Sequence, residues 1–98
     1  MNWPVYMLFS EKDSGLYVGC SENLPARLQE HSAGKVLSTR NRRPLVLIHR
    51  EVYEQKGKAF SRERFLKSLW GARLKRKILK DYLLARDHSV QAEWFRKG

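Results

Sequence analysis

The sequence predicts an α/β (α+β) domain in which a small, three-stranded, mostly antiparallel sheet is flanked by helices, in the order ββαβαα. Two short runs of β-branched and aromatic residues, separated by a turn that contains glycine, are typical of a β-hairpin. A third apolar run follows at residues 45–53, and apolar residues recur at helical spacing before and after it. Helices on both sides of the third run can cover a sheet that is too small to form a core alone.

The first part of the chain predicts the hairpin and one helix. We expect strands at residues 5–9 and 16–20, joined by a short polar turn. The helix begins after a cap at Ser21 or Asn23, since both side chains can accept a hydrogen bond from a free backbone N–H. It ends near Gly34, because glycine is the usual residue at the end of a helix.

The second part predicts one strand and two helices. A basic loop, residues 35–44, leads into a strand at residues 45–53. Helices are expected at about residues 58–69 and 72–85. Gly71 separates them, because glycine in a helix interior is unfavourable.

The length of 98 residues suits one domain. We expect this domain at residues 1–85, followed by a C-terminal tail, residues 86–98, that either docks or frays. The chain opens without the basic start and long apolar stretch of a signal peptide, and no segment is apolar enough to span a membrane. A single cysteine, Cys20, forms no internal disulfide. These features predict a cytoplasmic protein.

The positive charge is concentrated in the middle of the chain. Lys and Arg number 20 against 10 Asp and Glu, a formal net charge of +10. Residues 35–80 alone carry 15 bases and three acids, a net charge of +12, whereas residues 1–34 carry a net charge of −2. Such clustering favours a nucleic-acid partner over a membrane surface. A cationic surface without a specific partner is the alternative.

Two ionisable side chains interrupt the apolar face of the first predicted helix. Leu24, Arg27, Leu28 and His31 recur at the spacing of one helical face. A charge on a buried face needs a partner or a cleft, so Arg27 and His31 are candidate site residues. The alternative for Arg27 is a side chain whose charged end reaches solvent.

An acid interrupts the corresponding face of the next helix. Glu63 falls on one line with Ala59, Leu66 and Trp70, which we expect to be buried. Glu63 is therefore a third candidate site residue. A simple ion pair with Arg27 or Arg62 is the alternative.

The two predicted strands add phenols to the same region. In a hairpin that pairs Leu8 with Tyr17 and Tyr6 with Gly19, the two tyrosines lie on one face as diagonal neighbours. Gly19 has no side chain and leaves room for a substrate backbone. Two core tyrosines with satisfied hydroxyl groups are the alternative.

Together these motifs resemble the GIY-YIG nuclease superfamily, in particular its small single-domain bacterial members. The resemblance covers about residues 5–79 and rests on six motifs: Val5-Tyr6, Tyr17-Val18-Gly19, Arg27 with His31, Thr39-Arg40, Arg43-Pro44, and Arg62-Glu63 with Leu66-Lys67. The chain departs from the family pattern at Pro4, which replaces a glycine, and in having no asparagine after Asn41.

The resemblance implies a GIY-YIG-like fold and phosphodiester cleavage with a single divalent cation, Mg²⁺ or Mn²⁺. Glu63 would be the carboxylate that holds the metal, and Arg27 would neutralise charge on the phosphate. Tyr6 would be the general base or water-orienting phenol, with Tyr17 its partner and a phosphate contact, although the sequence by itself permits the reverse. His31 would relay a proton or hold a tyrosine or a phosphate, and a histidine that only packs the helix is the alternative.

The same resemblance and the charge pattern predict a DNA-binding surface. Its residues are Gly19, Lys35, Thr39, Arg40, Arg42, Arg43, Lys67, Arg73, Lys75 and Arg76. Contacts of this kind bind phosphate and do not read sequence. We therefore expect a DNA endonuclease of low sequence specificity that acts on branched or nicked DNA in repair or recombination.

Three alternatives remain open from the sequence. The chain could be a non-catalytic DNA-binding protein on this fold, a point that the absence of a late asparagine leaves open. It could instead bind RNA. It could also act only with a larger protein, for which Trp94-Phe95 would be the contact. The sequence does not indicate which protein that partner would be.

Overall fold

The computed structural model describes residues 2–97, and it describes the side chains as far as residue 87. The predicted order ββαβαα is confirmed, with two additional short 3₁₀ helices, η1 and η2. The elements in chain order are β1 (Trp3–Ser10), β2 (Leu16–Cys20), α1 (Leu24–Ser32), η1 (Arg40–Arg42), β3 (Leu45–Tyr53), α2 (Lys56–Lys67), η2 (Leu69–Gly71) and α3 (Ala72–Lys97).

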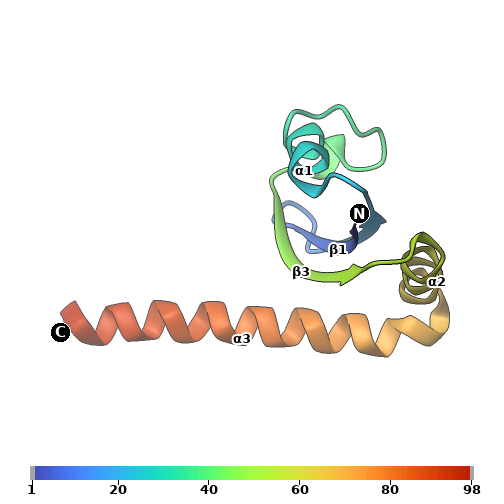
Figure 1. The fold of residues 1–98 in the computed structure, drawn as a ribbon. Helices are drawn as coiled ribbons and strands as arrows, with labels where there is room; N and C mark the ends of the chain where they lie inside the picture. The colour runs from blue at the N-terminus through green and yellow to red at the C-terminus, as the bar shows by residue number, and fades with distance from the viewer. Residues whose placement is uncertain (1, 98) are drawn as a thin grey trace.

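The sheet has the order β2-β1-β3, and both pairs of strands are antiparallel. The predicted register of the hairpin is confirmed, because Leu8 lies opposite Tyr17 and Tyr6 lies opposite Gly19. β1 is therefore the central strand, and β2 is an edge strand. α1 lies on one side of the sheet, and α2 and α3 lie on the other (Figure 1).

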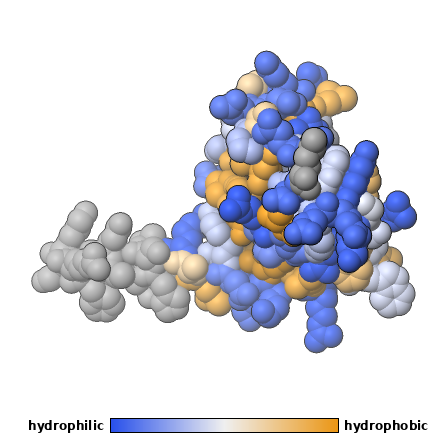
Figure 2. Space-filling view, viewed as in Figure 1, coloured by the Kyte–Doolittle hydropathy of each residue, from blue (hydrophilic) through white to orange (hydrophobic). Residues whose placement is uncertain are grey.

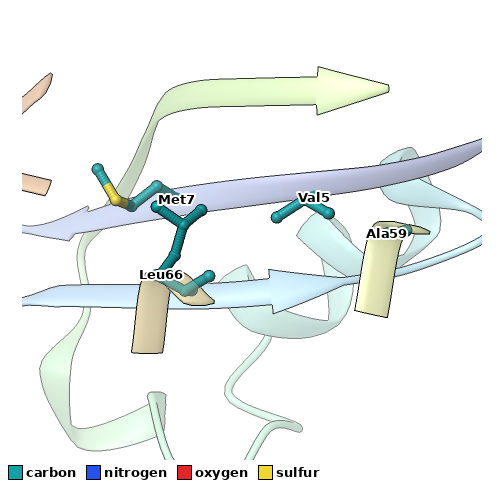
Figure 3. Packing of buried hydrophobic residues seen from close by; sticks show 5 residues of the cluster. Val5, Met7, Ala59 and Leu66 are labelled. Carbon is teal, nitrogen blue, oxygen red and sulfur yellow. The ribbon is translucent and has the colours of Figure 1, made fainter. Parts of the chain in front are cut away.

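The alternation of side chains along β1 divides the interior into two layers. Val5 and Met7 pack with Val18, Ala59 and Leu66 on the side of α2. Figure 3 shows Leu66 reaching from α2 toward Met7, with Ala59 farther along the helix, near Val5. These residues form the larger apolar core.

The opposite layer is smaller and contains polar groups. Tyr6 and Leu8 pack there with Leu24, and Tyr17, Leu28 and Leu45 surround them. Because helices cover both sides of β1, Val5 to Ser10 form an unbroken buried segment. The two candidate tyrosines thus belong to the layer beneath α1.

A tight corner joins α2 to α3. A side chain at Gly71 would collide with the backbone of Phe65 and Leu66, so only glycine fits where the chain turns back. Gly71 separates the two helices as predicted. The prediction that Trp70 lies on the buried stripe of Glu63 is wrong: α2 ends at Lys67, the helical spacing stops there, and Trp70 is 85% exposed.

α3 is longer than predicted. It continues from Ala72 through the expected end at residue 85 to Lys97, because this segment contains neither glycine nor proline. The side chains of Trp94 and Phe95 lie outside the part of the chain whose side chains are described. Of the helices in the described residues, none has the length and apolar character needed to cross a membrane.

Candidate active site

A chain of buried hydrogen bonds starts at Tyr6. The Tyr6 hydroxyl group lies 2.9 Å from His31 Nε2, and His31 Nδ1 lies 2.8 Å from Thr39 Oγ1. All three side chains are at most 1% exposed. β1, α1 and the loop after α1 are therefore joined by one polar network inside the smaller layer.

The surroundings of His31 favour its neutral form. Burial lowers the pKa of His31, and the nearby positive charge of Arg27 lowers it further. A neutral imidazole has one donor and one acceptor nitrogen, so it joins one hydroxyl group that donates to one that accepts. His31 thus holds Tyr6 and Thr39 in fixed orientations.

Gly19 makes room for the Tyr6 side chain and not for a substrate. A Cβ atom at Gly19 would lie 2.5 Å from the Tyr6 hydroxyl oxygen. The space that the missing side chain leaves is therefore filled by the Tyr6 phenol. The expectation that Gly19 admits a substrate backbone is wrong for this reason.

Thr39 also differs from expectation. We expected it on the nucleic-acid-binding surface, but its side chain is completely buried and its hydroxyl group contacts His31. A buried side chain cannot contact a phosphate in this arrangement. Thr39 instead holds the loop after α1 against the network.

The two tyrosines have different environments. Burial raises the pKa of Tyr6 to about 12, with a further increase from Tyr17 that Arg27 only partly offsets. Tyr6 therefore stays a neutral phenol near pH 7. Tyr17 lies on the edge strand and is only half-buried, with its ring centroid 6.2 Å from that of Tyr6 and 5.0 Å from that of His31. Of the pair, Tyr17 is the phenol that solvent reaches.

Arg27 lies at the boundary of the network. Its Nη1 donates to Glu30 Oε2 at 2.9 Å, and its side chain is partly exposed. Burial alone would lower the pKa of Arg27, but the neighbouring Tyr6 and Glu30 outweigh it and raise the pKa, so the guanidinium stays charged. Because surface ion pairs are weak, this charge is available to an anion that approaches Tyr17.

Glu63 reaches the same region from α2. Its side chain is 23% exposed and accepts a hydrogen bond from Lys67 Nζ at 3.0 Å. The Lys67 ammonium group in turn lies 6.0 Å from the centroid of the Tyr17 ring. Glu63 thus lies near the edge strand β2, and its pairing with Lys67 contradicts the alternative of an ion pair with Arg27 or Arg62.

The Cys20 thiol, at the end of β2, also lies close enough to Glu63 to be affected by its charge. Burial raises the pKa of the Cys20 thiol, and the charge of Glu63 raises it further. The thiol stays protonated near neutral pH and is not an activated nucleophile. We therefore assign Cys20 no chemical role.

The chemistry of Glu63 fits one hard divalent cation. The described residues contain no group of three His, Cys, Asp or Glu side chains that could hold a metal ion. A single carboxylate in a partly exposed position is, however, a suitable protein ligand for Mg²⁺ or Mn²⁺, which keep water and take phosphate oxygens as further ligands. The residues present therefore fit such a cation.

Two of the predicted DNA-binding arginines have partners within the protein. Arg42 Nε binds Asp13 Oδ2 at 3.1 Å, and Arg43 donates to the carbonyl oxygens of Arg40 and Ser32 at 2.9 and 3.2 Å. These contacts fix the loop from α1 to β3. Arg42 and Arg43 thus stabilise the loop.

The other predicted cations are exposed or partly exposed on three different elements. Lys35 and Arg40 are exposed on the loop, and Lys67 is exposed on α2. Arg73 and Arg76 are exposed on α3, and Lys75 is partly exposed. Figure 2 shows hydrophilic side chains projecting over much of the face in view. All of these side chains reach solvent, although Lys67 also pairs with Glu63.

One polar cluster was missed from the sequence. Glu51 on β3 accepts two hydrogen bonds from Arg62, at 2.8 and 3.1 Å, and also contacts Tyr53 and His49. Burial alone would raise the pKa of Glu51, but these bonds outweigh it and lower the pKa to about 2. The sequence contained a signal for this cluster. His49, Glu51 and Tyr53 are alternate residues of one strand, and such residues share a face. The cluster joins β3 to α2 on the side away from Tyr6.

Comparison with known proteins identifies the fold and the family. Residues 2–77 match the family described as the GIY-YIG catalytic domain. The chain belongs to this family. GIY-YIG domains are nuclease-type domains, which agrees with the resemblance carried by Tyr6, Tyr17 and Glu63.

Relatives support this assignment along most of the chain. A UPF0213 protein of Natronomonas pharaonis is 40% identical over 75 residues, which are 76% of this chain and 87% of the relative. A UPF0213 protein of Clostridium perfringens is 41% identical over 70 residues, 70% of this chain and 73% of the relative. The solution NMR structure of a UPF0213 protein from Bacillus halodurans is similar with a TM-score of 0.51 and 29% identity, covering 80% of this chain and 83% of that one.

Proposed function

We propose that this GIY-YIG protein is a metal-dependent endonuclease that hydrolyses phosphodiester bonds in DNA. The observation that carries the proposal is the position of Tyr17, half-exposed beside the Tyr6–His31 pair and beneath the Lys67 ammonium group that pairs with Glu63. A solvent-accessible phenol, a guanidinium and a carboxylate near one sheet edge suit the hydrolysis of a phosphate ester.

Glu63 and Arg27 handle the negative charge of the phosphate. Glu63 would hold one Mg²⁺ or Mn²⁺ ion, which supplies Lewis-acid stabilisation of the phosphate oxygens. Arg27 would bind a phosphate oxygen, replacing its weak pairing with Glu30. If Glu63 held the metal, Lys67 would lose its partner and its ammonium group would be available to a phosphate.

Tyr17, and not Tyr6, is proposed as the phenol that orients or deprotonates the attacking water. Tyr6 has no access to water, and its pKa of about 12 keeps it neutral. Tyr6 and His31 would instead position the Tyr17 ring, through a tilted ring contact from Tyr6 and an edge contact from His31. This exchanges the roles that the family resemblance suggested for the two tyrosines.

The phosphate contacts come from the exposed cations. Lys35 and Arg40 on the loop after α1, Lys67 on α2, and Arg73, Lys75 and Arg76 on α3 would bind phosphates of the DNA. Arg42 and Arg43 keep the loop in place through Asp13 and the backbone. Such contacts support binding of low sequence specificity, with branched or nicked DNA in repair or recombination as the substrate.

Residues 1–85 would form the catalytic unit, acting in the cytoplasm, and α3 continues beyond this unit to Lys97. The fold itself does not guarantee turnover. A DNA- or RNA-binding protein without activity is therefore the second outcome that the experiment must separate.

The test is cleavage of supercoiled plasmid and of branched DNA with Mg²⁺ or Mn²⁺. We expect nicking that EDTA abolishes and that Glu63→Ala and Arg27→Ala each reduce by at least about 10²-fold. Glu54→Ala, an exposed acid elsewhere on the chain, is the matched control and should keep full activity. Activity that survives Glu63→Ala contradicts the proposed metal ligand. Salt-sensitive binding without cleavage would favour the binding protein.

A further inference from the structure

The corner between α2 and α3 presents two large apolar side chains to solvent. Leu69 is 93% exposed and Trp70 is 85% exposed. Tryptophan is highly buried on average, so this degree of exposure is unusual. Within the part of the chain whose side chains are described, the Trp70 indole has neither a ring contact nor a hydrogen-bond partner.

A groove runs from Trp70 along α3. It has a volume of about 750 Å³ and is lined by Trp70, Arg73, Leu74, Arg76, Lys77 and Lys80. Four of these described lining residues carry a positive charge, and none carries a carboxylate. Lys77 is paired with Asp81 just outside, at 3.5 Å, but both side chains are largely exposed and the pair is weak. The groove thus combines an aromatic end with a cationic rim.

We propose that Trp70 stacks on an unpaired nucleobase of the substrate while the cations of the groove bind the adjoining phosphates. This inference rests on the proposed function and names its substrate class: DNA that contains single-stranded nucleotides. An aromatic ring beside a positive groove is the combination by which proteins bind single strands. Bases within a duplex already stack on one another and present no face to Trp70.

The charge of the groove argues against the other occupants. A second copy of the chain docked through Trp70 in a symmetric dimer would bring two sets of four cations together. A protein partner would need an acidic surface around an aromatic pocket. A nucleic-acid strand supplies both the flat apolar base and the negative charge at every nucleotide.

The position of the groove connects it to the candidate active site. The Lys67 ammonium group lies over the Tyr17 ring. Trp70 follows three residues later, so the Cα atoms of Lys67 and Trp70 are at most about 11 Å apart. Stacked nucleotides repeat about every 3.4 Å along one strand. Trp70 would therefore meet a base within a few nucleotides of the phosphate at Tyr17, which is where a branch or flap would be recognised.

The test is DNA binding by the full 98-residue chain in EDTA, so that no cleavage is needed. The probes are a fluorescein-labelled oligo(dT) strand and a blunt duplex of equal length, measured by fluorescence anisotropy. Trp70→Ala should weaken binding of oligo(dT) by about tenfold or more and binding of the duplex by less than about twofold. Trp70→Phe should retain most of the affinity for oligo(dT), because it keeps a ring that stacks.

Leu84→Ala is the matched control, because Leu84 is an exposed apolar residue of α3 outside the groove. It should leave both affinities unchanged. Circular dichroism should give the same helix content for all variants. An equal loss on oligo(dT) and duplex, or no loss on either, would overturn the inference. So would a wild-type dimer that Trp70→Ala converts to a monomer in size-exclusion chromatography.

Failure of the inference and failure of the proposed function give different results. Cleavage that needs Glu63 together with unchanged single-strand binding in Trp70→Ala rejects only the role of Trp70. Loss of single-strand binding in Trp70→Ala without any cleavage by the wild type supports the role of Trp70 and rejects the endonuclease.

Discussion

The two sides of the sheet differ in what they bury. The side beneath α2 and α3 buries apolar side chains, with Met7 and Leu66 at the centre. The side beneath α1 buries a hydrogen-bonded chain, Tyr6 to His31 to Thr39. Apolar burial stabilises the fold but is not directional. A satisfied polar network also fixes the orientations of the side chains that form it. One side therefore supplies most of the stability, and the other positions the candidate chemistry.

Alternation along a single strand produces this difference. Val5 and Met7 face one side, and Tyr6 and Leu8 face the other. Substitutions at neighbouring positions of β1 should thus have unlike effects, on stability in one case and on activity in the other. This contrast can be tested by substituting residues on each side of the sheet.

The largest effect should follow loss of the half-buried phenol of Tyr17. Tyr17→Phe should lower kcat by about 10² to 10⁴-fold, the range for loss of a group that transfers or orients a proton. Tyr6→Phe should lower kcat by only about tenfold and reduce stability by about 1 kcal/mol, because it removes one buried hydrogen bond. Plasmid nicking under single-turnover conditions measures both. The reverse order would return the role of base to Tyr6.

Leu66→Ala should show the opposite pattern. Leu66 is 1% exposed and packs with Met7, so its truncation should reduce the free energy of unfolding by about 2 to 5 kcal/mol. The kcat of the remaining folded protein should be close to that of the wild type. Urea unfolding and nicking on the same preparation test this. A loss of kcat equal to that of Tyr17→Phe would show that the two sides are not separable.

Glu51→Gln probes the polar cluster on the apolar side. Its side chain is 21% exposed, and loss of the charge should cost about 1 to 3 kcal/mol at pH 7. The folded pKa of about 2 lies below the ordinary 4.5. Glu51 therefore stabilises the protein fully above about pH 4.5 and progressively less as the pH falls toward 2.

Urea unfolding of wild type and Glu51→Gln at pH 7 and pH 3 measures this dependence. The difference between the two proteins should be smaller at pH 3. A difference that grows as the pH falls would contradict the lowered pKa of Glu51. Nicking at pH 7 should be unaffected in the folded variant, since the cluster lies on the other side of the sheet from Tyr6.

The smallest effect is expected at the surface of α1. Glu30→Ala removes the partner of Arg27, and an exposed pair of this kind contributes less than about 0.5 kcal/mol to stability. Binding of DNA should be unchanged or slightly tighter, because Arg27 is freed for phosphate. Thermal unfolding and anisotropy check the two statements, and a loss of several kcal/mol would show that the pair has a structural role.

Local pattern was enough for the elements and for the hairpin. The period of two in strands and of 3.6 in helices is set by nearest neighbours, so the order ββαβαα and the pairing of Tyr6 with Gly19 could be predicted. The same periods placed Tyr6 and Tyr17 on one face. They also placed Arg27 and His31 together on α1.

Partners from distant elements could not be predicted in this way. The sequence offered Arg27 or Arg62 as partners of Glu63, but Lys67 takes that position and Arg62 binds Glu51. Such choices depend on how α2 lies against β2 and β3. Similarly, Trp70 does not lie on the buried face of α2, because the helix ends at Lys67.

The sequence by itself therefore determined the order of the main helices and strands, the basic character of the middle of the chain and the family motifs, together with the hairpin register for an even-length turn. Only the tertiary structure decided that Tyr6 is buried and Tyr17 half-exposed, that Thr39 supports His31, and that Trp70 faces solvent. The physical reason is that periodicity arises from local backbone geometry. Burial, and with it the pKa and accessibility of a side chain, arises from contacts between segments that are far apart in the chain.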